Sequence, residues 1–119
     1  MISAETSILM VIDVQGKLAQ SMRERESLFR NLQILIQGAQ ILGVPILWLE
    51  QNPAGLGLTV PEIGRLLKGQ KPFSKMTFRA CGCPEAFEAL KASGRPQAIL
   101  AGIEAHVCIY LTAADLVAQ

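Results

Sequence analysis

The sequence predicts an α/β protein with a parallel sheet flanked by helices. Short, continuously apolar runs alternate with longer segments of helical periodicity along the 119 residues, which is typical of βα units. Continuous apolar runs indicate parallel strands, because such strands are buried on both faces. Half of the residues are hydrophobic, 18% are charged and the mean hydropathy is +0.34, which suits a well-buried core and excludes a disordered chain. We expect one domain, residues 1–119.

A long amphipathic helix is predicted between the first two strands in the sequence. Residues 7–14 form an apolar run that ends in an acidic turn, and residues 46–49 form the second run. Between them, apolar side chains of residues 27–42 recur at steps of three and four on one face, and Gly43 follows as a helix stop. The proline and glycines of residues 50–57 predict a loop after the second strand.

The second half continues the alternation of helix and strand. Thr59 is expected to cap a short helix, and Pro84 to begin another in its first turn. The predicted elements are, in order, a short helix over 61–67, a weak strand over 71–75, a helix over 84–92, a strand over 97–101 and an apolar helix over 107–118.

Charge and hydropathy exclude several classes of function. The net charge is only +1 and no Lys/Arg cluster is interleaved with aromatic residues, so we expect no nucleic-acid partner. The apolar run Ile8–Ile12 is closed by Asp13 and is far shorter than the ~20 residues of a membrane span, so no membrane partner is expected. No basic segment precedes that run, which argues against a signal peptide and for a cytoplasmic protein.

The three cysteines are an odd number without a secretory segment, which favours reduced thiols. Cys81 and Cys83 are interpreted as two ordinary thiols, because zinc takes four ligands and no further Cys or His lies near them. Cys108 differs, because an apolar strand followed by a short turn delivers it to the start of a helix. The positive end of a helix favours thiolate and can hold an oxyanion, so Cys108 is a candidate nucleophile, with a buried space-filling thiol as the alternative.

Two further residues with matching chemistry follow strands of the predicted sheet. Asp13 ends the first strand and Lys75 ends the third, so both belong at the sheet edge where parallel α/β proteins bind ligands. There, a thiol could attack an electrophilic carbon while the aspartate moves its proton and the lysine stabilises the charges. The alternatives are that Asp13 caps a helix and that Lys75 is an ordinary solvated lysine.

Four segments, taken in order, carry a resemblance to a known family. The chain resembles the isochorismatase-like cysteine hydrolases, in the branch of isochorismatase-domain-containing proteins that lacks a metal site. The matching segments are Val11-Ile12-Asp13-Val14-Gln15, Glu50 to Gly57 with Thr59 to Ile63, Lys75-Met76-Thr77-Phe78, and Ala101 to Cys108.

The resemblance implies a three-layer, Rossmann-like fold with strand order 3-2-1-4-5-6, in which Asp13, Lys75 and Cys108 form a catalytic triad. It implies a cis peptide between Ile103 and Glu104, and an oxyanion hole made by the backbone N–H groups of Glu104 and Cys108. It further implies hydrolysis of a small-molecule substrate with an amide-like or vinyl-ether-like bond, no cofactor, and assembly as a homo-oligomer.

Some positions depart from the family pattern or are assigned more weakly. The only histidine is His106, so the His-containing metal site of the family's metal-dependent amidases is impossible and no metal is expected. His106 is interpreted as a residue at the helix start. Arg79 is either solvated or a cation at the pocket rim that favours anionic substrates. Three residues are weaker candidates for substrate contacts: Gln15, Gln51 and Phe78.

Family members continue beyond the helix that follows the cysteine, whereas this chain ends at Gln119. We therefore expect a domain truncated at its C-terminus, with its fourth strand left as an uncovered edge. A catalytically silent domain that serves oligomerisation or partner binding is the alternative to an active hydrolase.

Overall fold

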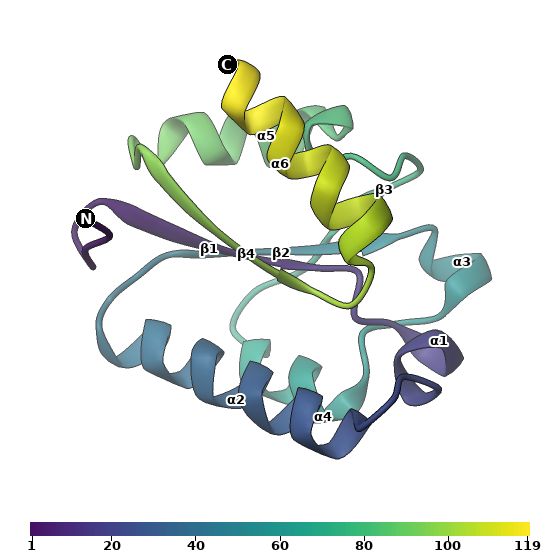
Figure 1. The fold of residues 1–119 in the computed structure, drawn as a ribbon. Coiled ribbons are helices and arrows are strands. Elements are labelled where there is room, and N and C mark those ends of the chain that lie inside the picture. Colours follow the sequence, from purple (N-terminus) through teal and green to yellow (C-terminus); the bar gives the residue numbers. More distant parts are fainter.

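The computed structural model describes residues 1–119, and its centre is a four-stranded parallel sheet with strand order β3-β2-β1-β4. The strands are β1 (Ser7–Ile12), β2 (Ile46–Gln51), β3 (Phe73–Lys75) and β4 (Gln97–Gly102). β1 lies in the middle and pairs in parallel with both β2 and β4. The predicted α/β class and the order of these four strands are confirmed (Figure 1).

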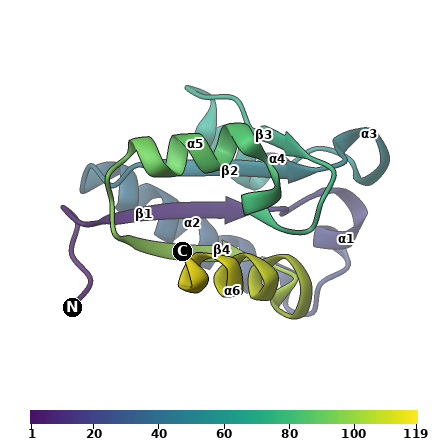
Figure 2. The same ribbon diagram turned by 90° about the horizontal axis from the view of Figure 1, so that it is seen from above.

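Helices cover both faces of the sheet. Figures 1 and 2 show α2 and α4 on one face and α5 and α6 on the other, while α1 and α3 lie beyond the carboxyl ends of β1 and β2. No helix is long and apolar enough to span a membrane. The helices are α1 (Gly16–Gln20), α2 (Arg25–Ile41), α3 (Pro53–Leu56), α4 (Pro61–Gly64), α5 (Pro84–Ala92) and α6 (Tyr110–Ala118), with 3-10 turns η1 (Arg65–Leu67) and η2 (Ala80–Gly82) and a π-helical turn η3 (Ala105–Ile109).

The core is divided by the sheet into two layers, and β1 contributes to both. All six residues of β1 are buried, and its side chains alternate between the two faces. Leu9 and Val11 pack in the cluster that includes the apolar face of α2, whereas Met10 and Ile12 pack in the cluster that includes Cys108. Each such side chain contributes about 1.5–3 kcal/mol by leaving water, so the sheet is anchored at its central strand.

The segment after β2 differs from the prediction. β2 extends to Gln51 and a short helix, α3, follows where a loop was expected. Thr59 does not cap α4; instead its hydroxyl accepts a hydrogen bond from Trp48 Nε1 at 2.8 Å and donates one to Glu50 at 2.7 Å. Glu50 is 3% exposed, and its carboxylate accepts hydrogen bonds from both the hydroxyl and the N–H of Thr59, as a buried polar group requires.

Two apolar grooves lie beside β4, which has a single strand neighbour. One, of about 280 Å³, is lined by side chains of α2, β1 and β4, among them Leu35, Leu42 and Ile99. The other, of about 500 Å³, lies between β4 and α6 and includes Leu100 and Leu116. Both grooves flank the sheet edge and neither includes Asp13, Lys75 or Cys108.

Candidate active site

Asp13 is placed by the way β1 ends. Its N–H still donates to the carbonyl of Leu49 at 3.2 Å, as the last bond of the β1–β2 ladder. Its φ of 58° is left-handed, a conformation that aspartate tolerates better than most residues, and it turns the chain out of the sheet. Gln15 then forms an antiparallel bridge with Thr59. The turn leaves the Asp13 carboxylate at the end of the sheet, where it is 4% exposed, and it does not cap a helix.

Lys75 ends β3, and its ammonium group is fully enclosed. Nζ donates to Asp13 Oδ2 at 2.7 Å and to the carbonyls of Thr77 and Phe78 at 2.9 and 3.2 Å. The side chain is fully buried, so the interpretation as a solvated surface lysine is wrong. All three N–H bonds of the ammonium are used within the chain, which holds the Asp13 carboxylate in one orientation.

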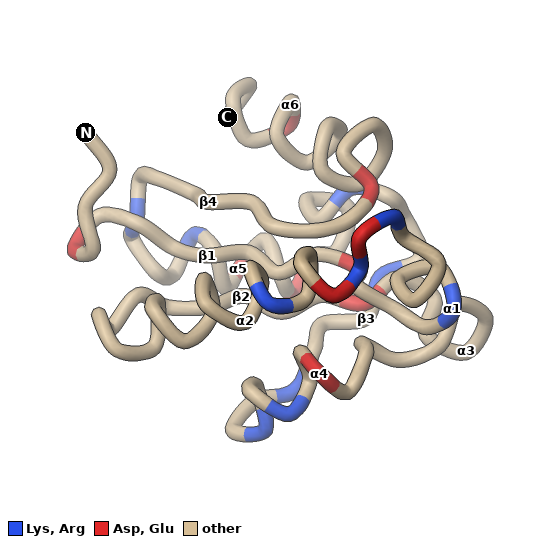
Figure 3. Tube along the Cα trace, turned by 60° about the horizontal axis from the view of Figure 1, so that its bottom comes forward, with Lys and Arg blue, Asp and Glu red and all other residues tan.

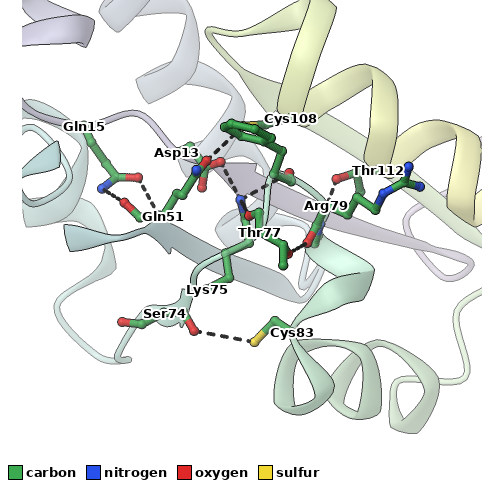
Figure 4. A network of polar contacts seen from close by, with 12 residues as sticks. Asp13, Gln15, Gln51, Ser74, Lys75, Thr77, Arg79, Cys83, Cys108 and Thr112 are labelled. Atoms are coloured by element: carbon green, nitrogen blue, oxygen red, sulfur yellow. Dashed lines mark hydrogen bonds and ion pairs between the residues drawn. The ribbon is translucent and has the colours of Figure 1, made fainter. Parts of the chain in front are cut away.

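Cys108 lies in the π-helical turn η3, directly before α6, and is 1% exposed. Its Sγ donates to Gln51 Oε1 at 3.4 Å (Figure 4). Burial, and next the interaction with the Asp13 carboxylate, raise the pKa of Cys108 from 9.0 to about 12, and the opposing effect of the Lys75 charge is smaller. The expectation that a helix N-terminus favours the thiolate is therefore wrong for this structure, because Cys108 is the fourth residue of its turn and is near a carboxylate.

The second carboxylate oxygen of Asp13 completes the arrangement. Asp13 Oδ1 is buried and has no hydrogen-bond partner, whereas Oδ2 is held by Lys75. A buried carboxylate oxygen without a partner is rare and costly, and it is often found where chemistry takes place. A neutral thiol and a free carboxylate oxygen close to it are suited to proton transfer from sulfur to oxygen.

The remaining candidate residues fall into different surroundings. Gln15 is 2% exposed, and the oxygen and the nitrogen of its side-chain amide are both bonded to the backbone. Gln51 is half-buried beside the thiol. Phe78 is 51% exposed. Arg79 forms an ion pair with Asp115 of α6, and His106 is exposed on η3.

The backbone before the cysteine differs from what the family resemblance implies. No peptide bond in the chain is cis, so the expected cis bond between Ile103 and Glu104 is wrong. The turn is made instead by η3, in which the N–H groups of Val107 and Ile109 both donate to the carbonyl of Glu104. The N–H of Glu104 itself has no hydrogen-bond partner within the chain.

Two ion pairs lie in and next to the site, Lys75–Asp13 and Arg79–Asp115, and the other charged groups are spread along the chain. Figure 3 shows positive and negative residues alternating where the chain enters α2, and a group of positive residues after α4. That group, Arg65, Lys68 and Lys71, precedes the amino end of β3, whereas Lys75 is at its carboxyl end.

No group of three or more His, Cys, Asp or Glu side chains is arranged to hold a metal ion. Cys81, Cys83 and Cys108 are free thiols.

Two hydroxyl groups near the site were not predicted from the sequence. Thr77 Oγ1 donates to the carbonyl of Arg79 at 2.9 Å and shapes the turn around the Lys75 ammonium. Thr112, fully buried on α6, accepts a hydrogen bond from the N–H of Ala80 at 3.0 Å and joins that turn to the cysteine helix. The one available signal was that Thr112 is, with Asp115, one of the residues that interrupt an apolar helix.

Comparison with known proteins identifies the family. The family model of the isochorismatase domain matches residues 7–119, and this chain belongs to the isochorismatase family. Members of this family are generally hydrolases with this α/β fold. Isochorismatase domain-containing protein 2 of Danio rerio is 39% identical over 116 residues, which cover 97% of this chain and 57% of the relative.

Solved structures give the same result. The MAR1 ribonuclease of Caenorhabditis elegans has a TM-score of 0.88 and 37% identity, over 98% of this chain and 60% of that protein. The YcaC gene product of Escherichia coli, described as an octameric hydrolase of unknown specificity, has a TM-score of 0.91 and 21% identity, over 98% of this chain and 59% of that protein. At 21% identity, the similarity to the E. coli protein shows only that the fold is shared. The chain thus spans little more than half the length of these relatives.

Proposed function

We propose that the chain is a cysteine hydrolase that acts on a small substrate with an amide-like or vinyl-ether-like bond through Asp13, Lys75 and Cys108. The observation that carries the proposal is the buried, unpartnered Oδ1 of Asp13, because Lys75 holds the other oxygen while the Cys108 thiol is near it. A pKa of about 12 keeps the Cys108 thiol neutral at physiological pH, so the nucleophile requires a base, and Asp13 is the adjacent one.

For an amide, the reaction proceeds in two steps. In the first, the thiol proton moves to Asp13 Oδ1 while Sγ bonds to the carbonyl carbon, and the backbone N–H groups of Glu104 and Cys108 receive the developing oxyanion. Asp13 then gives the proton to the nitrogen, the C–N bond breaks and a thioester remains. In the second step, Asp13 takes a proton from water, the hydroxyl adds to the thioester carbon, and the acid leaves as the proton returns to sulfur. Lys75 stabilises the charge on Asp13 throughout, and these steps need no cofactor.

Substrate contacts are assigned by position. Gln51, with its side-chain amide at the thiol, orients the substrate, and the exposed ring of Phe78 forms one wall. Arg79 is neutralised by Asp115, and Glu104 adds a negative charge near Cys108, so the site favours neutral over anionic substrates.

The enclosed Asp13–Lys75 pair beside the thiol argues against a catalytically silent domain, since a buried ion pair is costly to keep without a use. The three free thiols suit a reducing cytoplasmic environment. We also propose that the chain assembles as a homo-oligomer, in keeping with the octamer described for the E. coli structural neighbour.

RNA is a second candidate substrate, because the worm structure with 37% identity is described as a ribonuclease. The charges are less favourable for it. Lys75 and Arg79 are both paired with acids, and the free cations after α4 are near the opposite end of β3. Phosphodiester binding relies on unpaired Lys and Arg, so RNA is expected to bind weakly here.

The proposal is tested by a hydrolysis screen that includes small neutral amides, their anionic analogues, vinyl ethers and a single-stranded RNA. Wild type is compared with Cys108→Ala and with Cys81→Ser, which removes a thiol that is not one of the three site residues. We expect turnover of a neutral small molecule, its loss in Cys108→Ala and its retention in Cys81→Ser. Turnover that survives Cys108→Ala overturns the mechanism, and turnover of RNA alone moves the assignment to the second candidate.

A further inference from the structure

Gln15 has an unusual set of partners for a side chain that follows a strand. Its Nε2 donates to the carbonyls of Gln51 and Gly57 at 3.0 and 2.7 Å, and its Oε1 accepts from the N–H of Gln51 at 2.7 Å. Both N–H bonds and the oxygen of the side-chain amide are therefore bonded to the backbone, and Gln15 is 2% exposed. No donor remains on Gln15 for a substrate.

The bonds to Gln51 take the place of the hydrogen bonds that β1 would make if it continued beside β2. β1 and β2 pair up to Ile12 and Leu49, after which the left-handed turn at Asp13 takes the chain out of the ladder. The N–H and C=O of Gln51, which point toward the missing strand, would be left without partners. The Gln15 amide satisfies both of them and so acts as one further residue of β1 (Figure 4).

The residue held in this way is the one that contacts the thiol. Gln51 Oε1 accepts the hydrogen bond from Cys108 Sγ, and Gln51 is in register with Lys75 on β3. We propose that Gln15 is a positioning residue: its amide holds the Gln51 backbone in place of a strand, and Gln51 in turn holds the Cys108 thiol in the site. This inference rests on the proposed function only in taking Cys108 as the nucleophile.

The first test uses the unaltered chain and no substrate. Hydrogen exchange of the backbone N–H of Gln51 is measured by NMR. We expect its exchange to be slowed as strongly as that of residues within β2, although no strand faces it. Fast exchange of the Gln51 backbone N–H overturns the proposal, and this measurement does not depend on any variant folding.

The second test measures how fast Cys108 is alkylated by iodoacetamide, with peptide mass spectrometry to separate it from Cys81 and Cys83. The variants are Gln15→Met, Gln51→Ala and the double variant. Gln33→Met is the matched control, because Gln33 also donates its Nε2 to a backbone carbonyl, that of Glu62, away from the site. Loss of one ordinary hydrogen bond that keeps the thiol protonated speeds its alkylation by about fivefold.

We expect that increase in each single variant, no further increase in the double variant and no change in Gln33→Met. Thermal unfolding confirms that each variant is folded. A double variant that multiplies the two effects to about 25-fold overturns the coupling between Gln15 and Gln51, because independent sites are additive in free energy. An unchanged rate in a folded Gln15→Met overturns the proposal. Because no substrate is used, absence of hydrolysis in the screen would leave these results intact and would count against the proposed function alone.

Discussion

Replacing Lys75 by methionine should lower the free energy of unfolding by about 3–5 kcal/mol, the cost of leaving one buried charge without its partner. The estimate follows from the Nζ to Asp13 Oδ2 distance of 2.7 Å and from side-chain exposures of 0% and 4%. The carbonyls of Thr77 and Phe78 also lose a donor, but both hydrogen bonds are only part-buried, so their loss adds little to this cost. At about 4 °C per kcal/mol for a domain of this size, the midpoint of thermal unfolding falls by about 12–20 °C.

The assay is urea unfolding near neutral pH, with linear extrapolation to water. Lys91→Met is the control, because Lys91 pairs with Glu88 at 3.1 Å but the two side chains are 57% and 70% exposed. Such a pair contributes less than about 1 kcal/mol. The double variant Asp13→Asn/Lys75→Met should be more stable than Lys75→Met, since it removes the orphaned charge and asparagine tolerates the left-handed backbone. A loss below about 1 kcal/mol in Lys75→Met, or no recovery in the double variant, would refute the reasoning.

The other predictions concern the pH dependence of stability, the space around two glycines, and the hydrogen bond between Trp48 and Thr59. The folded-state pKa of Cys108 is raised from 9.0 to about 12, so its contribution to stability is complete below pH 9 and is lost as pH rises toward 12. Cys108→Ala should therefore show a shallower loss of stability than wild type in alkaline urea titrations; equal slopes would contradict this. Gly102→Ala should cost about 1–3 kcal/mol, because its Cβ would lie 2.6 Å from a backbone oxygen of β1. Gly38→Ala, with open space around it in α2, should instead stabilise by about 0.5–1 kcal/mol; calorimetry compares the two. Thr59→Val leaves the Trp48 indole N–H without its acceptor and should cost about 1–3 kcal/mol, measured by tryptophan fluorescence during unfolding.

Much of the fold could be predicted because the strands are encoded locally. β1 and β4 are within two residues of their expected bounds, and α5 begins and ends as expected, since Pro84 fixes its first turn. The short helices α1 and α3 were not predicted, because helices of five and four residues have no measurable periodicity. Their positions depend on tertiary contacts beyond the sheet.

The site, like the fold, could be predicted from the sequence only in part. Strand order brings Asp13 and Lys75 together, so a pattern of strand ends was sufficient to place them at one edge. The state of Cys108 could not be predicted, because it depends on a carboxylate 95 positions earlier in the chain and on a π-helical turn that sequence periodicity does not reveal. The same holds for Gln15, whose amide takes on the role of a strand only after the backbone has turned at Asp13.

The left-handed backbone of Asp13 joins two requirements in one residue. The aspartate that is proposed to move protons is also the residue whose conformation ends the central strand, so side-chain chemistry and chain direction are set together. Glutamate carries the same charge but tolerates this conformation less well and would extend the carboxylate by one methylene. A protein engineer who wished to transfer the three side chains to another parallel sheet would therefore have to copy the bend as well, together with a glutamine two residues later to fill the gap that the bend opens.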